Sequence, residues 1–185
     1  MNSDRLFDKQ LFDPIRQKKV AFLPEEVVRQ NLLNLMVDQL QFPKGLISVE
    51  KELSTLPHLK NNLKGETEGL RGQKANLKKV QNQNSSFFQD QKLPLRRVDI
   101  LVFGKNIHPL YPLYPLLMIE CKKDKLTEAA LQQVIGYNYH VQAYFVAVAG
   151  RDEIRVVFQD KKSQKIKTLD FLPSYLDLIR SIRGS

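Results

Sequence analysis

Apolar residues recur at helical spacing in three segments of the chain. In the first, a helix is predicted over residues 24–40, and its apolar face toward the core consists of Val28, Leu32, Leu35 and Met36. The first residue of this segment is a proline, which suits the first turn because its missing N–H would have no helical acceptor there. The other two helices are predicted over residues 126–142 and 172–183.

The segments between these helices contain short apolar or alternating runs that are typical of strands. Strands are predicted over residues 46–53, 97–103, 116–122, 144–149, 154–158 and 166–171. The resulting order is a helix, three strands, a helix, further strands and a last helix. This order indicates an α/β fold with a mixed central sheet that is flanked by helices.

Three segments lack such a pattern. Residues 1–22 have no clear period and are expected to form an N-terminal arm, and the prolines of residues 109–115 predict a turn or an extended loop. Residues 60–92 are rich in Asn, Gln, Lys and Ser, and bury too few apolar groups to offset the entropy of ordering. We expect a mobile basic loop there, within a single domain over residues 1–185, because core elements lie on both sides.

Composition narrows the class of protein. The 185 residues are 42% hydrophobic, and no apolar run is long enough for a membrane span. The N-terminus is too polar for a secretory signal, so the expected location is cytoplasmic. The single cysteine, Cys121, excludes an internal disulfide, and with three scattered histidines it gives no zinc-finger spacing. The net charge of +9 favours a polyanionic partner.

Charged residues end two otherwise apolar strands. Glu120 and Lys122 share one face of their strand, and Asp99 lies in the strand before it. If the two strands pair as a hairpin, Asp99 and Glu120 can converge beside the lysine. Paired carboxylates suit Mg²⁺, which would acidify a water and polarise a phosphate, while Lys122 stabilises negative charge. The alternative is that Glu120 and Lys122 are only the solvated end of a strand.

The helix that follows carries a second polar pair. Gln133 and Tyr137 are spaced i, i+4 and therefore lie on one helical face. If this face is directed at the charged strand ends, both side chains can donate hydrogen bonds to a phosphate backbone. Otherwise, Tyr137 is an aromatic residue at the edge of the core and Gln133 is a surface amide.

These pieces together resemble a known family. The residues that carry the resemblance are Leu23-Pro24-Glu25-Glu26-Val27-Val28-Arg29-Gln30, Val49-Glu50, Arg97-Val98-Asp99-Ile100, Ile119-Glu120-Cys121-Lys122 and Gln133 with Tyr137-Asn138. In this order, over residues 22–160 without the basic loop, they resemble the N-terminal nuclease domain of type I restriction enzyme R subunits. That domain belongs to the PD-(D/E)XK superfamily, although the chain has Val98 where the motif has proline.

The resemblance implies a restriction-endonuclease-like αβββαβ core and Mg²⁺-dependent cleavage of DNA, with Mn²⁺ as a substitute. It implies that Asp99 and Glu120 bind the metal ion, with Glu26 as a third acid, and that Lys122 is the catalytic lysine. Gln133 and Tyr137 match the family's QxxxY element. We expect these two residues, with Arg29 and Lys123, to contact DNA. Other restriction-system subunits are further expected partners, and a membrane is not.

Three functions therefore compete. The first is a metal-dependent deoxyribonuclease, for which endonuclease is favoured over exonuclease. The second is a module that keeps the fold for binding DNA or a subunit without turnover, and the third is an interaction domain with no nucleic-acid role. The intact set of Asp99, Glu120 and Lys122 favours the enzyme, and the net charge of +9 argues against the third.

The basic loop generates a prediction about salt dependence. Residues 60–92 contain seven basic and three acidic side chains, and only two aromatic ones. Deleting this segment should flatten the slope of log affinity for DNA against log salt, by roughly one unit for each phosphate that the segment neutralises. Binding at a series of salt concentrations measures the slope, and circular dichroism checks the fold. An unchanged slope would show that the segment stays away from DNA.

Overall fold

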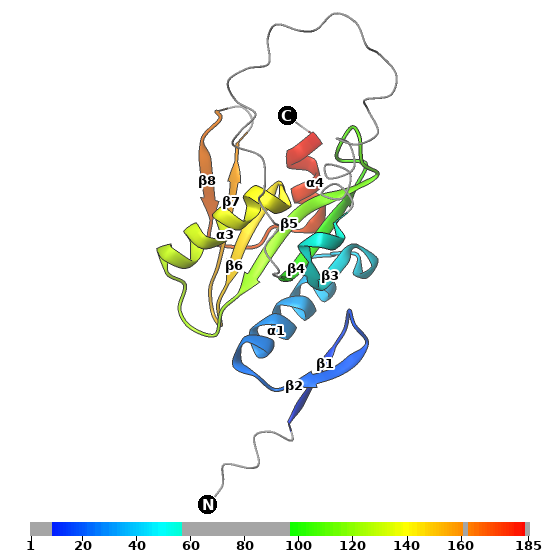
Figure 1. Ribbon diagram of the computed structural model, residues 1–185, viewed down its shortest axis with the longest axis vertical. Helices are drawn as coiled ribbons and strands as arrows, with labels where there is room; N and C mark the ends of the chain where they lie inside the picture. Colours follow the sequence, from blue (N-terminus) through cyan, green and yellow to red (C-terminus); the bar gives the residue numbers. More distant parts are fainter. Residues whose placement is uncertain (1–8, 57–96, 161–162, 184–185) are drawn as a thin grey trace, which may run out of the picture.

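The computed structural model describes residues 9–56, 97–160 and 163–183 (Figure 1). The predicted basic loop over residues 60–92 lies outside the described residues, as do residues 1–8. The strands are β1 (Gln10–Asp13), β2 (Lys18–Ala21), β3 (Ile47–Glu52), β4 (Arg97–Lys105), β5 (Leu113–Cys121), β6 (Phe145–Ala149), β7 (Ile154–Gln159) and β8 (Ile166–Leu169). The α-helices are α1 (Pro24–Asp38), α3 (Glu128–Val141) and α4 (Tyr175–Arg183), and Lys44–Leu46 and Leu53–Thr55 form single 3₁₀ turns.

The central sheet contains six strands in the order β3-β4-β5-β6-β7-β8 (Figure 1). β5 and β6 are parallel, and every other neighbouring pair in this sheet is antiparallel. The parallel pair is joined by α3, since parallel strands need a crossover connection. The chain therefore contains α1, β3, β4, β5, α3 and β6 in sequence, which confirms the restriction-endonuclease-like αβββαβ core that was expected.

Helices cover both faces of this sheet. α1 and α4 pack on one face around a core that includes Leu33, Met36 and Ile119, and α3 packs on the other around Leu131 and Val134. β5 and β6 lie in the middle, so both their faces are buried and their sequences are almost continuously apolar. Among the described helices, none combines the length and the apolar character needed to cross a membrane.

Local signals account for the ends of α1 and α3. α1 begins at Pro24, with Glu25 and Glu26 in its first turn, where negative charge is favourable. α3 begins after Thr127, whose side chain accepts a hydrogen bond from the Ala130 N–H. The predicted start at residue 126 was therefore two residues early. α3 ends at Val141 and is capped by Gln142, which has a left-handed φ of 57°.

Two segments differ from the sequence-based expectation. β5 begins at Leu113 and includes Pro115, so the turn or loop predicted for residues 109–115 is shorter. The pairing register with β4 shifts between Val102 and Phe103, and Phe103 is the residue that pairs with Pro115. A proline cannot donate to a sheet, and an irregularity of this kind is where a strand accommodates one.

The second difference is at the N-terminus. Within the expected arm, β1 and β2 pair as an antiparallel hairpin beside α1 (Figure 1). The Asp13 carboxylate shapes the turn, because its Oδ1 accepts hydrogen bonds from the backbone N–H groups of Ile15 and Arg16. Carboxylates that bind nearby backbone amides in this way stabilise turns.

The central position of Ile119 generates a stability prediction. Ile119 is fully buried in β5, on the face covered by α1 and α4. Ile119→Ala should lower the free energy of unfolding by about 2–5 kcal/mol, because it removes apolar packing and leaves a cavity. Urea denaturation measures the loss. The matched variant Ile166→Ala, at a residue that is 69% exposed, should change it by less than about 0.5 kcal/mol, and equal losses would contradict this placement.

Candidate functional site

The strand pair β4 and β5 positions Asp99 and Glu120. The two strands run antiparallel, and Ile100 pairs with Ile119, so Asp99 and Glu120 are the next residues along each strand. The expected hairpin therefore forms. Their side chains are partly accessible, with 20% of Asp99 and 15% of Glu120 exposed.

The two carboxylates nevertheless point to opposite faces of the sheet. Val98 packs in the core beneath α3, whereas Ile100 packs in the core beneath α1, so the strict alternation of β4 is broken at Asp99. The Asp99 Oδ1 accepts a 2.6 Å hydrogen bond from Nη2 of Arg29 in α1. Its Oδ2 accepts a 2.8 Å bond from the Cys121 N–H, which fixes the carboxylate against β5.

The neighbouring strand accounts for this break. β3 pairs with β4 through Val49 with Ile100 and through Lys51 with Val98, and the pairing skips Glu50 and Asp99. Glu50 has a left-handed φ of 51°, which is uncommon for a residue with a side chain. Backbone strain of this kind concentrates at functional sites. Here it directs Glu50 toward two arginines.

Glu120 lies on the face covered by α3. It lines a small hollow with Val98, Met118, Val134 and Tyr137, among other residues. The Lys122 ammonium is 3.8 Å from Oε1 of Glu120, and the Lys122 N–H donates to the Ala149 carbonyl at 2.8 Å. The structure thus brings Glu120, Lys122 and Tyr137 together on one face.

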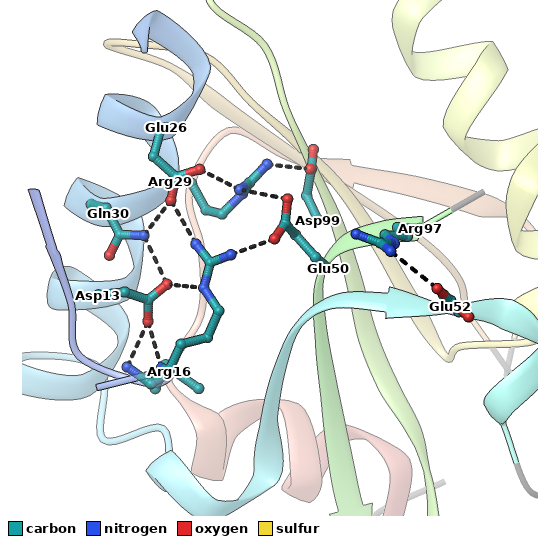
Figure 2. A network of polar contacts seen from close by, with 10 residues as sticks. Asp13, Arg16, Glu26, Arg29, Gln30, Glu50, Glu52, Arg97 and Asp99 are labelled. Carbon is teal, nitrogen blue, oxygen red and sulfur yellow. Dashed lines mark hydrogen bonds and ion pairs between the residues drawn. The ribbon is translucent and has the colours of Figure 1, made fainter. Parts of the chain in front are cut away.

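Arg29 is the centre of the polar contacts on the other face (Figure 2). Only 7% of this residue is exposed. Nη1 donates to Oε2 of Glu26 and lies 3.7 Å from Oε1 of Glu50, while Nη2 donates to Asp99. Burial by itself lowers the pKa of the guanidinium, but Asp99 and Glu26 outweigh burial and raise it. Arg29 is therefore a permanent cation that joins α1 to β4.

A second arginine extends this cluster to the N-terminal hairpin. Arg16 donates to Asp13 at 2.6 Å, to Glu26 at 2.8 Å and to Glu50 (Figure 2). Gln30 donates from one amide nitrogen to both Asp13 and Glu26. We call Asp13, Arg16, Glu26, Arg29, Gln30, Glu50 and Asp99 the arginine–carboxylate cluster.

Sequence reasoning did not assign Asp13, Arg16, Gln30 or Glu50 to the site. The short segment Asp13-Pro14-Ile15-Arg16 has a turn composition, which predicts a bend but not its partner. Gln30 is one helical turn from Glu26, so its spacing on the helix was a usable signal.

Residues 78–173 match a known protein family. Over this range, just over half of the chain, the sequence matches the model of the family described as type I restriction enzyme R protein N terminus. The chain belongs to this family. No curated protein matches it, and no solved structure does.

The family match covers only part of the candidate site. Asp99, Glu120, Lys122, Gln133 and Tyr137 lie inside the matched range of the R protein N-terminus family. The other residues of the arginine–carboxylate cluster lie before the matched range, as does α1. The part of the sequence resemblance that lies before residue 78 therefore has no counterpart in the family match, and the cluster's role rests on the contacts in this structure.

The donor groups of this R protein family member suit a hard divalent cation. Within the arginine–carboxylate cluster, four carboxylates face two guanidinium groups, so these groups sum to two negative charges. Mg²⁺ needs only one or two protein carboxylates, because it keeps several waters. Over the described ranges, however, no three acidic, histidine or cysteine side chains are grouped closely enough to hold a metal ion. Asp99 and Glu120 remain the predicted metal ligands, with Glu26 beside them.

The residues predicted to contact DNA occupy different settings. Gln133 is exposed on α3, Tyr137 is half-buried beside Glu120, and Arg29 is buried among acids. Lys123 is exposed and lines an open hollow of about 530 Å³ with Lys125, Arg151 and three acids. DNA binding by these four residues stays a prediction.

Burial and the charge of Asp99 raise the pKa of the Cys121 thiol, which packs as an apolar side chain.

The buried Asp13 carboxylate generates a prediction about pH. Burial by itself raises its pKa, but hydrogen bonds from Arg16, Gln30 and Ile15 outweigh burial and hold the pKa below its ordinary value. The carboxylate therefore stabilises the fold above its unfolded pKa of about 4, and this stability is lost as the pH falls through the lower folded pKa.

Asp13→Asn should lower the free energy of unfolding at pH 7 by about 1–3 kcal/mol, because charged hydrogen bonds are weakened. It should also make unfolding less dependent on pH below about 4. Urea denaturation between neutral and acid pH measures both effects. The exposed Asp152 provides the control Asp152→Asn, which should behave as the parent. An Asp13→Asn curve parallel to that of the parent would contradict the assignment.

Proposed function

We propose that the protein is a Mg²⁺-dependent deoxyribonuclease of the PD-(D/E)XK type that hydrolyses phosphodiester bonds. One observation carries the proposal: in a member of the R protein N-terminus family, Asp99 of β4 and Glu120 of β5 lie next to a paired position on adjacent strands, with Lys122 two residues beyond Glu120. Family membership supports a role related to restriction nucleases, and this placement supports hydrolysis by these three residues.

The residues fit a divalent metal ion in donor chemistry. Asp99 would hold it with Glu26, which bonds the same guanidinium. Glu120 would reach it around the strand ends, because its side chain lies on the opposite face of the sheet. When bound, Mg²⁺ supplies an acidified water and polarises the phosphate. Asp99 is held in one orientation by the Cys121 N–H at 2.8 Å, so its carboxylate is fixed before any ligand arrives.

Lys122 serves the reacting phosphate in this proposal. Its backbone is hydrogen-bonded to Ala149 of β6, and its ammonium lies 3.8 Å from Glu120. An ammonium that is held beside the scissile phosphate stabilises the negative charge that develops in the transition state. Glu120 holds the ammonium at the strand end through this ion pair, so the two side chains act as a unit.

DNA is the proposed substrate because the net charge is +9 and Lys123, Gln133 and Tyr137 follow the same strand ends along the chain. Polar groups of this kind bind the phosphate backbone and position it without reading sequence. We propose endonucleolytic cleavage, for which a closed circular DNA is the appropriate substrate because it has no ends. Other subunits of a restriction system are proposed partners.

A second candidate function has one observation in its favour. Arg29 already neutralises Asp99 through a direct ion pair, and Arg16 binds two further acids of the site, Glu26 and Glu50. An acidic site that is compensated by arginines is stable without a metal ion, as a binding module without turnover would require. This alternative predicts DNA binding that does not depend on Mg²⁺ and is not followed by cleavage.

The nuclease proposal predicts nicking of supercoiled plasmid in Mg²⁺ or Mn²⁺ and none in EDTA. Asp99→Ala, Glu120→Ala and Lys122→Ala should each lower the rate by about 100-fold or more, because each removes part of one electrostatic site. The double variant Asp99→Ala/Lys122→Ala should lose no more than the stronger single variant, since residues that act as a unit are not additive.

Exposed residues of the same types provide matched controls. Glu128→Ala and Lys165→Ala, prepared in the same way, should nick plasmid at the rate of the parent. Cleavage by Glu120→Ala alone at the parent rate would refute its assignment, and cleavage by every variant at that rate would reveal a contaminating nuclease. Binding of DNA by the parent without cleavage in either metal would favour the second candidate.

A further inference from the structure

The Arg29 guanidinium is bonded to Asp99, the carboxylate that binds a metal ion in the proposed function. Its Nη2 donates to Oδ1 of Asp99 at 2.6 Å, and its Nη1 bonds Glu26 (Figure 2). We propose that Arg29 is the resident counter-ion of Asp99, and that a divalent cation binds Asp99 by displacing the Arg29 guanidinium. This inference rests on the proposed function and adds a residue that sets the affinity of its site for metal ions.

The guanidinium is incompletely bonded where it lies. Arg29 is 7% exposed, and its buried Nε has no hydrogen-bond partner among the described residues. A buried N–H without a partner costs free energy, because it has given up its hydrogen bond to water. Arg29 therefore binds Asp99 less favourably than a guanidinium with all its donors satisfied, and a cation of higher charge can compete with it.

The surroundings give Arg29 other acceptors once Asp99 is taken. Glu26 already bonds its Nη1, and Oε1 of Glu50 is 3.7 Å from the same nitrogen. Arg16 bonds both of these acids, so they stay in place when the guanidinium moves. Asp13 holds Arg16 in turn. The cluster is thus a support on which Arg29 can exchange one carboxylate for another.

The charges also favour the exchange. The four carboxylates of the cluster face two arginines, and Glu120 lies one residue from Cys121, whose N–H bonds Asp99. Like charges held together destabilise each other unless a cation is present. Arg29 relieves this repulsion in the metal-free protein, and a divalent ion relieves it further. The two cations are then alternatives at one carboxylate, so each weakens the binding of the other.

The experiment measures binding of Mn²⁺ to the full chain by isothermal titration calorimetry. Arg29→Met should bind Mn²⁺ about tenfold or more tightly than the parent, because the competing charge is gone. Arg180→Met removes a positive charge that is 76% exposed and pairs with Asp177 of α4, and it should change the affinity by less than about twofold. Arg29→Met/Asp99→Asn should lose the gain, which locates the competition at Asp99.

Thermal unfolding provides a second measurement. Arg29→Met should melt below the parent in EDTA, since removing one partner leaves buried charges uncompensated, and it should gain more in melting temperature from Mn²⁺. If Arg29→Met does not fold, Arg29→Met/Glu50→Gln removes one charge of each sign while leaving the three predicted metal-binding acids intact, and it should show the same gain in affinity.

The outcomes separate the inference from the proposed function. Plasmid cleavage by the parent, with no gain in Mn²⁺ affinity for either Arg29 variant, overturns the inference and leaves the nuclease standing. A gain that requires Asp99, in a protein that cuts no DNA, supports the inference and overturns the nuclease. Equal gains for Arg29→Met and Arg180→Met overturn the inference by showing a general effect of charge. Absence of Mn²⁺ binding in every variant overturns both.

Discussion

The ion pairs of Arg29 are the interaction on which the rest of the site depends. They join Glu26 of α1 to Asp99 of β4 through one guanidinium that is almost completely buried. A buried pair of this kind contributes little net stability compared with apolar packing, but losing one partner is costly because the other charge remains in the interior. The positions of α1 and β4 relative to each other are therefore specified by charge as well as by the apolar core beneath them.

A local irregularity in β3 and β4 determines which face of the sheet Asp99 points to, relative to Glu120. If β3 and β4 alternated strictly, Asp99 would lie on the same face as Glu120. The left-handed residue Glu50 interrupts the pairing, and Asp99 reaches Arg29 instead. The two acids remain linked through the backbone at Cys121, so a ligand that binds both must lie around the edge defined by these strand ends. The same irregularity gives Arg29 the access to Asp99 on which the inferred competition rests.

The strands and helices were largely predictable because each has its own apolar pattern. Val28, Leu32 and Met36 mark the buried face of α1. Leu35, which the same pattern assigned to the core, is 38% exposed, because it lies at the margin of that face. The apolar runs of β5 and β6 indicate strands that are buried on both sides. The hairpin of β1 and β2 was not predicted, because its four-residue strands are stabilised by the polar turn at Asp13. The sequence predicted that Asp99 and Glu120 lie on paired strands. Their opposite directions depend on the positive φ angle of Glu50, which a glutamate at that position does not predict.

The sequence separation of the Arg29 ion pairs has a consequence for how the protein folds. Arg29 and Asp99 are 70 residues apart in the chain, and Arg16 and Glu50 are 34 apart. Interactions between distant residues form slowly, since a long loop must close before they stabilise anything. During synthesis, Arg29 is added to the chain 70 residues before Asp99, so α1 is present before its acidic partner on β4. The acidic centre is thus completed late, when β4 docks between β3 and β5, and an intermediate without β4 has no assembled site.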